Sequence, residues 1–259
     1  MNEIAQNIGE YMNGNNKEKV GMTISEAKAA VTSYATLKQY MGTKITDYNP
    51  TAGGTWRIFY YDADGDFGTA GKLYFLKRDY ISKDTKLTDY TSYTPSAEGL
   101  EIMKAMNPKW RDSSYSGIDK VNEHCVAWLC DTANWTNYKI AEADYAIGSP
   151  SVEMYMKAYN VWKDNNKDST TLICKIGNAN GYSVGANGNY NNNSGYSTAI
   201  NTIEAGPNNI FMTAGSNYWW LASPHSSSSN AVIHVNGKRA YVNGNIYNYA
   251  TGVCPVVSL

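Results

Sequence analysis

The sequence is poor in charge and has no cluster of basic residues. Asp, Glu, Lys and Arg make up 17% of its 259 residues, and 22 basic against 23 acidic side chains leave a net charge of −1. Proteins that bind nucleic acid usually concentrate Lys and Arg on one surface. No apolar run is long enough to cross a bilayer. We therefore expect no nucleic acid as a partner and no membrane contact by the chain as given.

The N-terminal residues give no sign of a secretory signal, because the polar pair Asn2-Glu3 follows Met1 where a basic and then an apolar region would stand. Two interpretations stay open: a protein without a leader, or a chain from which a leader has been removed. In the second case we expect a cell surface or a virion as its location.

The motifs of the common enzyme classes are missing as well. The chain contains no nucleophile elbow, phosphate-binding loop, dinucleotide fingerprint or HExxH helix. His124, His225 and His234 have no Cys or carboxylate at catalytic or metal-ligand spacing, and the scattered acidic residues give no glycosidase pair. We expect no enzymatic activity, no catalytic residues and no cofactor.

Cysteine is scarce, with four residues at positions 125, 130, 174 and 254. Cys125 and Cys130 would face different directions on one expected helix, which is a poor geometry for a disulfide. With His124 they do not match a zinc spacing. We expect all four to be buried thiols, and the redox compartment stays open.

Acidic residues cluster once, at Asp62, Asp64 and Asp66. A calcium loop of the EF-hand type would need Gly where Phe67 stands and Glu where Leu73 stands. We therefore interpret residues 62–71 as an Asp/Gly-rich hairpin turn and expect no metal site.

Tyrosine and glycine are abundant, with 22 of each, and there are 7 Trp. This composition is typical of β-rich, loop-rich extracellular proteins. Tyr, Ser, Gly and Asn also dominate adaptable binding surfaces, because Tyr supplies contact area at low entropic cost.

Local patterns predict an α+β fold with N-terminal helices, an early β-hairpin and a C-terminal antiparallel sheet. Thr23 and Glu26 form a capping box for a helix that stops at Gly42, after a shorter helix over 2–12. Strand-like residues over 55–61 and 72–78 predict the hairpin. Further helices are expected over 96–106, over 118–131 and from Ser149-Pro150, with Ser149 as N-cap. We divide the chain into an N-terminal helical segment, 1–44, and a domain over 45–259.

The C-terminal stretch, 216–259, contains two hairpin signals, Asn236-Gly237 and Asn243-Gly244. A two-residue turn at Asn236-Gly237 pairs His234 with Arg239. One face then carries Ala231, Ile233, Val235, Ala240 and Val242, and the other carries Val232, His234, Arg239 and Tyr241. The second turn would place Ile246 and Asn248 beside His234 and Arg239. An ordinary amphipathic sheet with a solvated face is the alternative to a binding face.

Trp219 and Trp220 stand next to each other in the apolar block that opens this stretch. Adjacent strand residues point to opposite faces, so we expect one indole to be buried and the other not.

Several motifs carry a resemblance. Residues 218–223 read YWWLAS and residues 252–259 read GVCPVVSL; upstream, residues 56–60, 143–150 and 153–155 read WRIFY, ADYAIGSP and EMY. These stretches resemble a domain family of unknown function from gut Firmicutes and their phages, which usually ends in a GVRPVVSL-type motif. Cys254 stands where that family tends to have Arg. The family is similar in architecture to the C-type-lectin-fold variable proteins of diversity-generating retroelements.

The resemblance implies a C-type-lectin-like ligand-binding domain with a diversified C-terminal face. In such systems mutagenised template adenines convert Asn codons to Tyr, Ser, His, Asp or Ile codons, and residues 225–249 are rich in several of these types. The implied ligand is a protein or glycan on a cell or phage surface. The expected binding residues are His225, Ser226, Ser227, Ser228, Asn230, His234, Arg239, Tyr241, Ile246, Tyr247, Asn248 and Tyr249.

Other interpretations stay open. A pilin-like or surface structural subunit without a specific ligand is the first, and an enzyme of the formylglycine-generating type is the second. The Asn/Gly-rich residues 178–195 are either a connecting loop or part of a binding surface.

Overall fold

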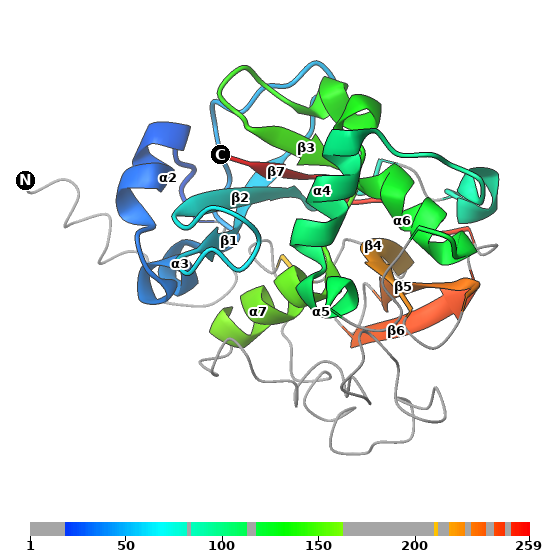
Figure 1. The fold of residues 1–259 in the computed structure, drawn as a ribbon. Coiled ribbons are helices and arrows are strands. Elements are labelled where there is room, and N and C mark those ends of the chain that lie inside the picture. Colours follow the sequence, from blue (N-terminus) through cyan, green and yellow to red (C-terminus); the bar gives the residue numbers. More distant parts are fainter. Residues whose placement is uncertain are drawn as a thin grey trace, which may run out of the picture.

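A computed structural model of the chain describes residues 19–81, 84–112, 118–162, 210–211, 218–225, 229–236, 241–246 and 250–259; for residues 236 and 241–246 it describes the backbone alone. Helices and antiparallel sheets are both present, which confirms the α+β class (Figure 1). The expected helix over 2–12, Cys174 and the loop over 178–195 lie outside the described residues.

The first described helices are α2 (Ile24–Ala30) and α3 (Tyr34–Tyr40). The capping box of Thr23 and Glu26 is confirmed, and Gly42 follows α3 with a positive φ of 82°. The expected single helix is wrong, however, because the chain leaves helical geometry at Val31 and starts again at Ser33. The Ser33 hydroxyl accepts a hydrogen bond from the Thr36 amide, so Ser33 is the N-cap of a second helix.

Strands β1 (Trp56–Asp62) and β2 (Lys72–Lys77) form the predicted hairpin. The Asp62 carboxylate organises the turn between them by accepting hydrogen bonds from the amides of Asp66 and Phe67, both at 2.8 Å. An Asp side chain that accepts from nearby backbone amides is the usual means of closing such a turn. The hairpin-turn interpretation of residues 62–71 is therefore confirmed.

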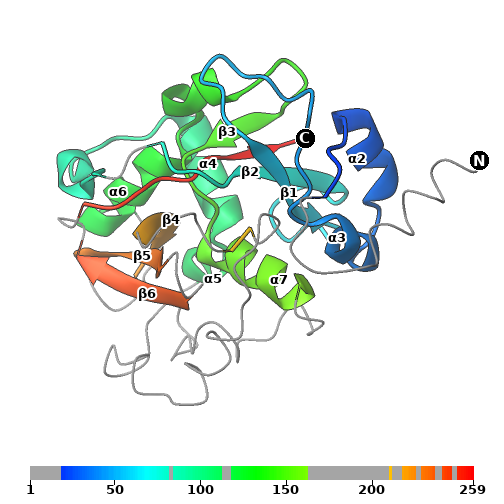
Figure 2. The same ribbon diagram turned by 180° about the vertical axis from the view of Figure 1, so that it is seen from behind.

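The last strand in chain order, β7 (Val256–Ser258), lies inside the first sheet, between β2 and β3 (Tyr145–Ile147). The strand order is β1-β2-β7-β3, and every neighbouring pair is antiparallel. Figure 2 shows β7 crossing the middle of the molecule between these strands. The first sheet therefore depends on a strand that lies far from its neighbours in the sequence.

Helices fill the sequence between the two sheets. They are η1 (Leu87–Tyr90), α4 (Ala97–Met106), α5 (Pro108–Arg111), α6 (Val121–Cys130), η2 (Thr132–Tyr138) and α7 (Val152–Trp162). Helix α4 lies in front of the first sheet in Figure 1 and behind it in Figure 2. Ser96 is the N-cap of α4, as predicted.

Helix α7 starts later than the sequence suggested. The cap is Ser151 and not Ser149, because the Ser151 hydroxyl accepts a hydrogen bond from the Met154 amide at 3.2 Å. Pro150 precedes the helix, and its carbonyl accepts a hydrogen bond from the Ala222 amide. The long-range pairing of Pro150 with the second sheet thus delays the helix by two residues.

The second sheet consists of β4 (Tyr218–Pro224), β5 (Ala231–Asn236) and β6 (Tyr241–Ile246) in that order. The predicted two-residue turn is wrong, because Asn236 pairs with Tyr241 and four residues connect the strands. Asn243-Gly244 lies inside β6 and is not a turn. The observed register places Val242 opposite Val235 and Ile246 opposite Ala231, so matching of apolar strand positions outweighs the local turn preference.

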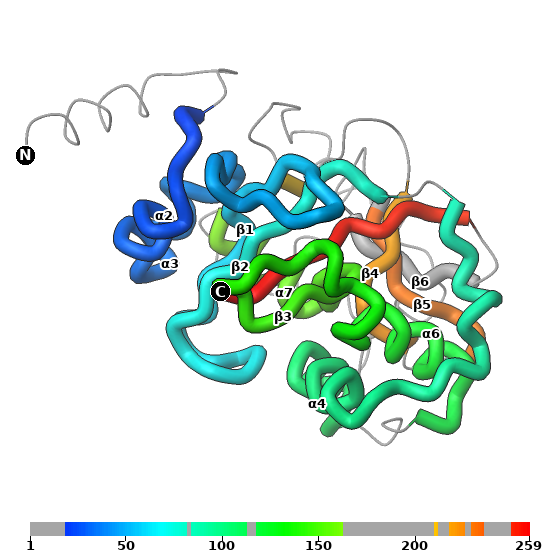
Figure 3. Tube along the Cα trace, turned by 90° about the horizontal axis from the view of Figure 1, so that it is seen from above, coloured from blue at the N-terminus to red at the C-terminus, as the bar shows by residue number. Residues whose placement is uncertain are grey.

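One hydrophobic core joins both sheets and the helices. Figure 3 shows α2 and α3 at one end of the molecule, β4 to β6 at the other, and the first sheet between them. Ala27, Val31 and Leu37 belong to this core, so residues 19–44 pack on the rest of the chain. The domain division at residue 44 stays a prediction.

Trp219 and Trp220 are both fully buried, so the expected contrast in burial is wrong. The Trp219 ring packs against Tyr155 of α7, and on the opposite face of β4 the Trp220 Nε1 donates to the Thr85 carbonyl. Strand β4 is therefore covered on both sides.

Three cysteines are buried free thiols, as predicted: Cys125, Cys130 and Cys254. Burial raises the pKa of Cys125 to about 12. Among the described residues, none of the helices has the length and the apolar character needed to cross a bilayer.

Candidate functional site

The strongest candidate for a recognition surface is the end of the second sheet where β4 passes into β5. The chain leaves the sheet at Pro224, and it returns at Ala231. The His225 amide donates to the Ala231 carbonyl at 3.0 Å and closes the neck of this loop. His225 is half-buried at the neck, and Asn230 is exposed beside it. Two of the predicted binding residues thus flank one loop.

A single buried side chain from another element holds this neck. Asn122, at the start of α6, is 0% exposed. Its Nδ2 donates to the carbonyls of His225 at 3.0 Å and of Ala231 at 3.1 Å, and its backbone amide donates to the Ser229 carbonyl at 3.1 Å. An amide nitrogen has two hydrogens to donate, so one Asn side chain is enough for both contacts.

The three carbonyls that accept these hydrogen bonds, those of His225, Ser229 and Ala231, belong to the main chain. A backbone carbonyl has the same position and strength as an acceptor whatever side chain its residue carries, proline geometry apart. The loop residues can therefore change without removing a hydrogen bond from the neck. Sequence reasoning missed Asn122, because nothing in the residues around it indicates a partner more than 100 positions away.

His234 does not lie on a solvated face, which corrects the predicted exposure. Its side chain is 2% exposed in the middle of β5, where Ala231, Val232, Ile233 and Val235 are also buried. The cause is position: β5 is the central strand of its sheet and is covered on both faces. The alternation along the strand showed which residues share a face, but it could not show that both faces are covered by other parts of the protein.

The His234 ring packs edge-on against two aromatic side chains. Its centroid lies 4.8 Å from that of Tyr218 and 6.1 Å from that of Trp220. Neither ring nitrogen has a hydrogen-bond partner within the described part of the chain. Burial lowers the pKa of His234 from 6.5 to about 4, so the ring is neutral at pH 7. Tyr218 is 40% exposed and covers this histidine at the surface, a contact that the sequence did not indicate.

The remaining predicted binding residues are placed only in part. Tyr241 pairs with Asn236 and therefore lies at a position on the same face of the sheet as His234, as expected. Ile246 pairs with Ala231 and lies at a position on the opposite face, which corrects the prediction. The rest lie outside the described residues: Ser226, Ser227, Ser228, Arg239, Tyr247, Asn248 and Tyr249.

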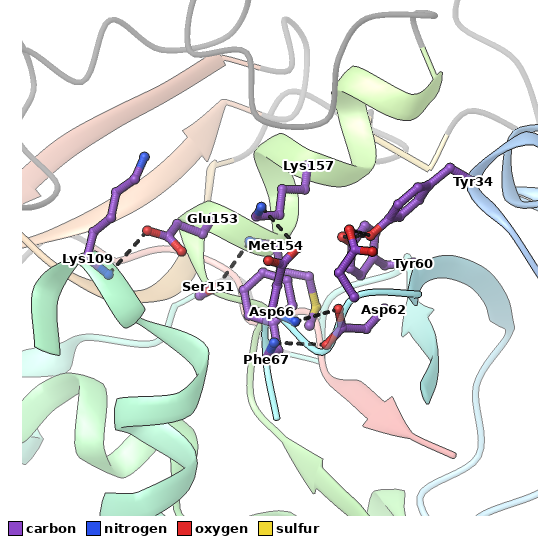
Figure 4. Close-up of polar contacts among 11 residues, drawn as sticks. Tyr34, Tyr60, Asp62, Asp66, Phe67, Lys109, Ser151, Glu153, Met154 and Lys157 are labelled. Carbon is purple, nitrogen blue, oxygen red and sulfur yellow. Dashed lines mark hydrogen bonds and ion pairs between the residues drawn. The ribbon is translucent and has the colours of Figure 1, made fainter. Parts of the chain in front are cut away.

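A second polar cluster lies on the far side of α7, around the β1–β2 turn (Figure 4). The Asp66 carboxylate forms an ion pair with Lys157 of α7 at 3.0 Å, and the Tyr34 hydroxyl donates to Asp64 at 3.1 Å. Together with the capped amides around Asp62, these contacts dock the turn on α3 and α7. No three His, Cys, Asp or Glu side chains among the described residues are grouped so that they could hold a metal ion.

Glu123, next to Asn122 on α6, is buried and has a shifted pKa. Burial raises the pKa of this carboxyl to about 7, against the opposing effect of hydrogen bonds from the Lys120 amide and the Trp110 Nε1. The nearest described polar partners are structural, and the side chain stabilises the first turn of α6. Its hydrogen bonds thus join the first turn of α6 to Trp110 of α5.

Comparison of the chain with models of known families, with curated proteins and with solved structures gave no match.

Proposed function

We propose that the protein is a ligand-binding protein whose recognition surface is the loop over residues 225–231 and the adjoining end of the second sheet. The scaffold would be C-type-lectin-like, and the protein would be the variable protein of a diversity-generating retroelement. Its ligand would be a protein or glycan on a cell or phage surface.

The observation that carries the proposal is the Asn122 clamp. A diversified binding loop needs a frame that does not depend on the residues being diversified. Asn122 meets this requirement because it is buried and donates to the main-chain carbonyls of His225 and Ala231. Loops positioned by a rigid scaffold are where binding residues usually lie.

The topology supports the proposal at a coarser level. The last strand, β7, returns to the middle of the first sheet, and the second sheet precedes it in the sequence. The chain on both sides of the second sheet is therefore anchored in the rest of the fold.

The proposal is tested by separating folding from recognition. Ser226, Ser227, Ser228 and Asn230 are replaced together, once by Ala and once by Tyr. We expect both variants to unfold within about 0.5 kcal/mol of the parent, since these changes leave the clamp intact. Captured partners are identified by mass spectrometry from bacterial and phage surface extracts, and we expect the three proteins to capture different sets.

The clamp itself provides the contrasting variant. Asn122→Asp keeps the shape of the side chain but removes both donors, so His225 and Ala231 lose a buried hydrogen bond each and the protein loses about 1–3 kcal/mol of stability. Asn137→Ala, at an exposed asparagine, is the matched control and should change nothing. The proposal is wrong if the loop variants fail to fold, or if they capture the same partners as the parent. Capture of no specific partner by any of them would favour a structural surface subunit.

A further inference from the structure

The two sheets have four edges, and three of them are closed. The outer side of β1 pairs with the preceding chain, where Ile45 donates to Trp56 and Ile58 donates to Thr43. Strand β3 is three residues long, is packed against η2, and is followed by Gly148, which donates to Leu129. The outer side of β4 is satisfied by Gly252 and Pro150. At β1 and β4 backbone hydrogen bonds occupy the outer side of the strand, whereas at β3 the strand is short and covered by η2.

The fourth edge, β6, is open among the described residues. It has six residues, all in unbroken register with β5, whereas the β1–β2 and β4–β5 ladders both contain a register shift. Edge strands are normally protected from association by short length, bulges, proline or charge. The sequence of β6, YVNGNI, has no proline and no charged residue. A regular edge of this length without any of these protective features is suited to pairing with another strand.

The sequence around β6 is nearly symmetric about Gly244. Asn243 and Asn245 flank it, followed outward by Val242 and Ile246. If two copies of β6 pair antiparallel with the two Gly244 residues opposite each other, Val242 lies opposite Ile246 of the second copy, and Asn243 lies opposite Asn245. Apolar positions then meet apolar positions and amide positions meet amide positions, which is the matching that stabilises cross-strand pairs.

We propose that β6 pairs antiparallel with β6 of a second copy of this chain, about a two-fold axis that passes between the two Gly244 residues, to form one continuous six-stranded sheet. The self-complementary pattern is the reason for choosing a second copy as the partner, since an isologous contact requires that one surface match itself. The central strand β5 is buried on both faces, so β6 is held on a firm template. The inference does not depend on the ligand-binding proposal.

The geometry also sets the strength of such a dimer and the relative orientation of its two copies. A six-residue ladder buries less surface than a standard permanent interface, so we expect reversible, concentration-dependent association. The two-fold axis is perpendicular to the sheet and reverses the strand direction between copies. The two loops over 225–231 would therefore lie at opposite ends of the joined sheet and could bridge two ligands.

The test is a charge exchange across the proposed axis, read by sedimentation velocity. The parent should dimerise as its concentration rises through the micromolar range. The double variant Asn243→Lys, Asn245→Lys should stay monomeric, as should Asn243→Asp, Asn245→Asp, because each brings like charges opposite one another. An equimolar mixture of the two should recover the dimer. Ser92→Lys with Thr94→Lys, at two exposed positions outside the second sheet, is the control and should dimerise like the parent.

Three results would overturn the proposal: a parent that stays monomeric up to millimolar concentration, charge variants that dimerise like the parent, or a mixture that stays monomeric. If the charge variants do not fold, Gly244→Cys decides, since its thiol would lie opposite its own copy. Mild oxidation should then give a disulfide-linked dimer that Ser92→Cys does not give. An accessible but unlinked cysteine at position 244 contradicts the pairing.

Discussion

The two sheets are built in opposite ways. In the first sheet, β7 pairs with β2 and β3, which both lie far before it in the sequence, and the outer sides of the sheet are covered by other segments. In the second sheet, β4, β5 and β6 follow one another in sequence and in space, and one side stays open in the described chain. The first sheet therefore pairs strands that are distant in the sequence, and the second pairs consecutive strands.

This difference between the sheets predicts different tolerance to substitution. A change in the first sheet disturbs pairing between segments that have no other means of meeting. A change at the end of the second sheet disturbs one local connection, whose neck is already fixed by Asn122. We expect the cost of substitution to fall from the first sheet, through the buried centre of the second, to its loop end.

The largest effect is expected in β7. Val257 is fully buried in the middle of the first sheet, opposite Phe75 on one side and Ala146 on the other. Val257→Asp would bury an unpaired charge, and we expect it to cost more than about 4 kcal/mol and to prevent folding. Val20→Asp, at a side chain that is 63% exposed, should leave the melting temperature unchanged. Thermal unfolding of both variants is followed by circular dichroism. A folded Val257→Asp protein would contradict the expected sensitivity of the first sheet.

The next effect concerns the centre of the second sheet and depends on pH. Burial lowers the pKa of His234 from 6.5 to about 4, so the unfolded chain takes up the proton first as pH falls. The stability contributed by the neutral ring is complete above pH 6.5 and is lost towards pH 4, by about 3 kcal/mol in all. Denaturant unfolding of the parent and of His234→Phe across this range measures the difference.

The comparison with His234→Phe is needed because Glu123 acts in the opposite direction. Its pKa is raised to about 7, so its contribution to stability is present at low pH and is lost as pH rises from 4.5 to 7. The parent curve contains both contributions, and Glu123 is unchanged in the variant. A difference between the two proteins that does not vary with pH would show that His234 titrates normally and is accessible to solvent.

The smallest effect distinguishes the two faces of β4. The Trp220 Nε1 donates to the Thr85 carbonyl at 3.0 Å, while the Trp219 Nε1 has no hydrogen-bond partner among the residues that the structure describes. Trp220→Phe should therefore cost about 0.5–1.5 kcal/mol more than Trp219→Phe, because only the first removes a hydrogen bond, while the Thr85 carbonyl keeps the bond from the Thr251 amide. Urea midpoints of the two variants give the answer. Equal midpoints would mean that both indoles, or neither, are paired.

Local signals in the sequence predicted local structure well. The capping box of Thr23 and Glu26, the stop at Gly42 and the β1–β2 hairpin depend on residues within one element, and all three are confirmed. The later start of α7 and the burial of both Trp219 and Trp220 depend on contacts with distant segments. Periodicity could not show them, because it reports which residues share a face and not what covers that face.

The candidate site was predicted in part. His225 and Asn230 do flank one loop, and Tyr241 takes the expected alternate position on β6. The register error arose because Asn-Gly was given more weight than the pairing of Val242 with Val235. Asn122 and Tyr218 were missed, since each acts through a partner that the sequence around it does not reveal.

The position of β7 also sets the order in which the protein can be completed during synthesis. A ribosome makes β1, β2 and β3 long before it makes Val256–Ser258, so the first sheet waits with a gap between β2 and β3. Until β7 is in place, β2 and β3 each expose an edge to which another chain could pair, so the incomplete protein is prone to aggregate.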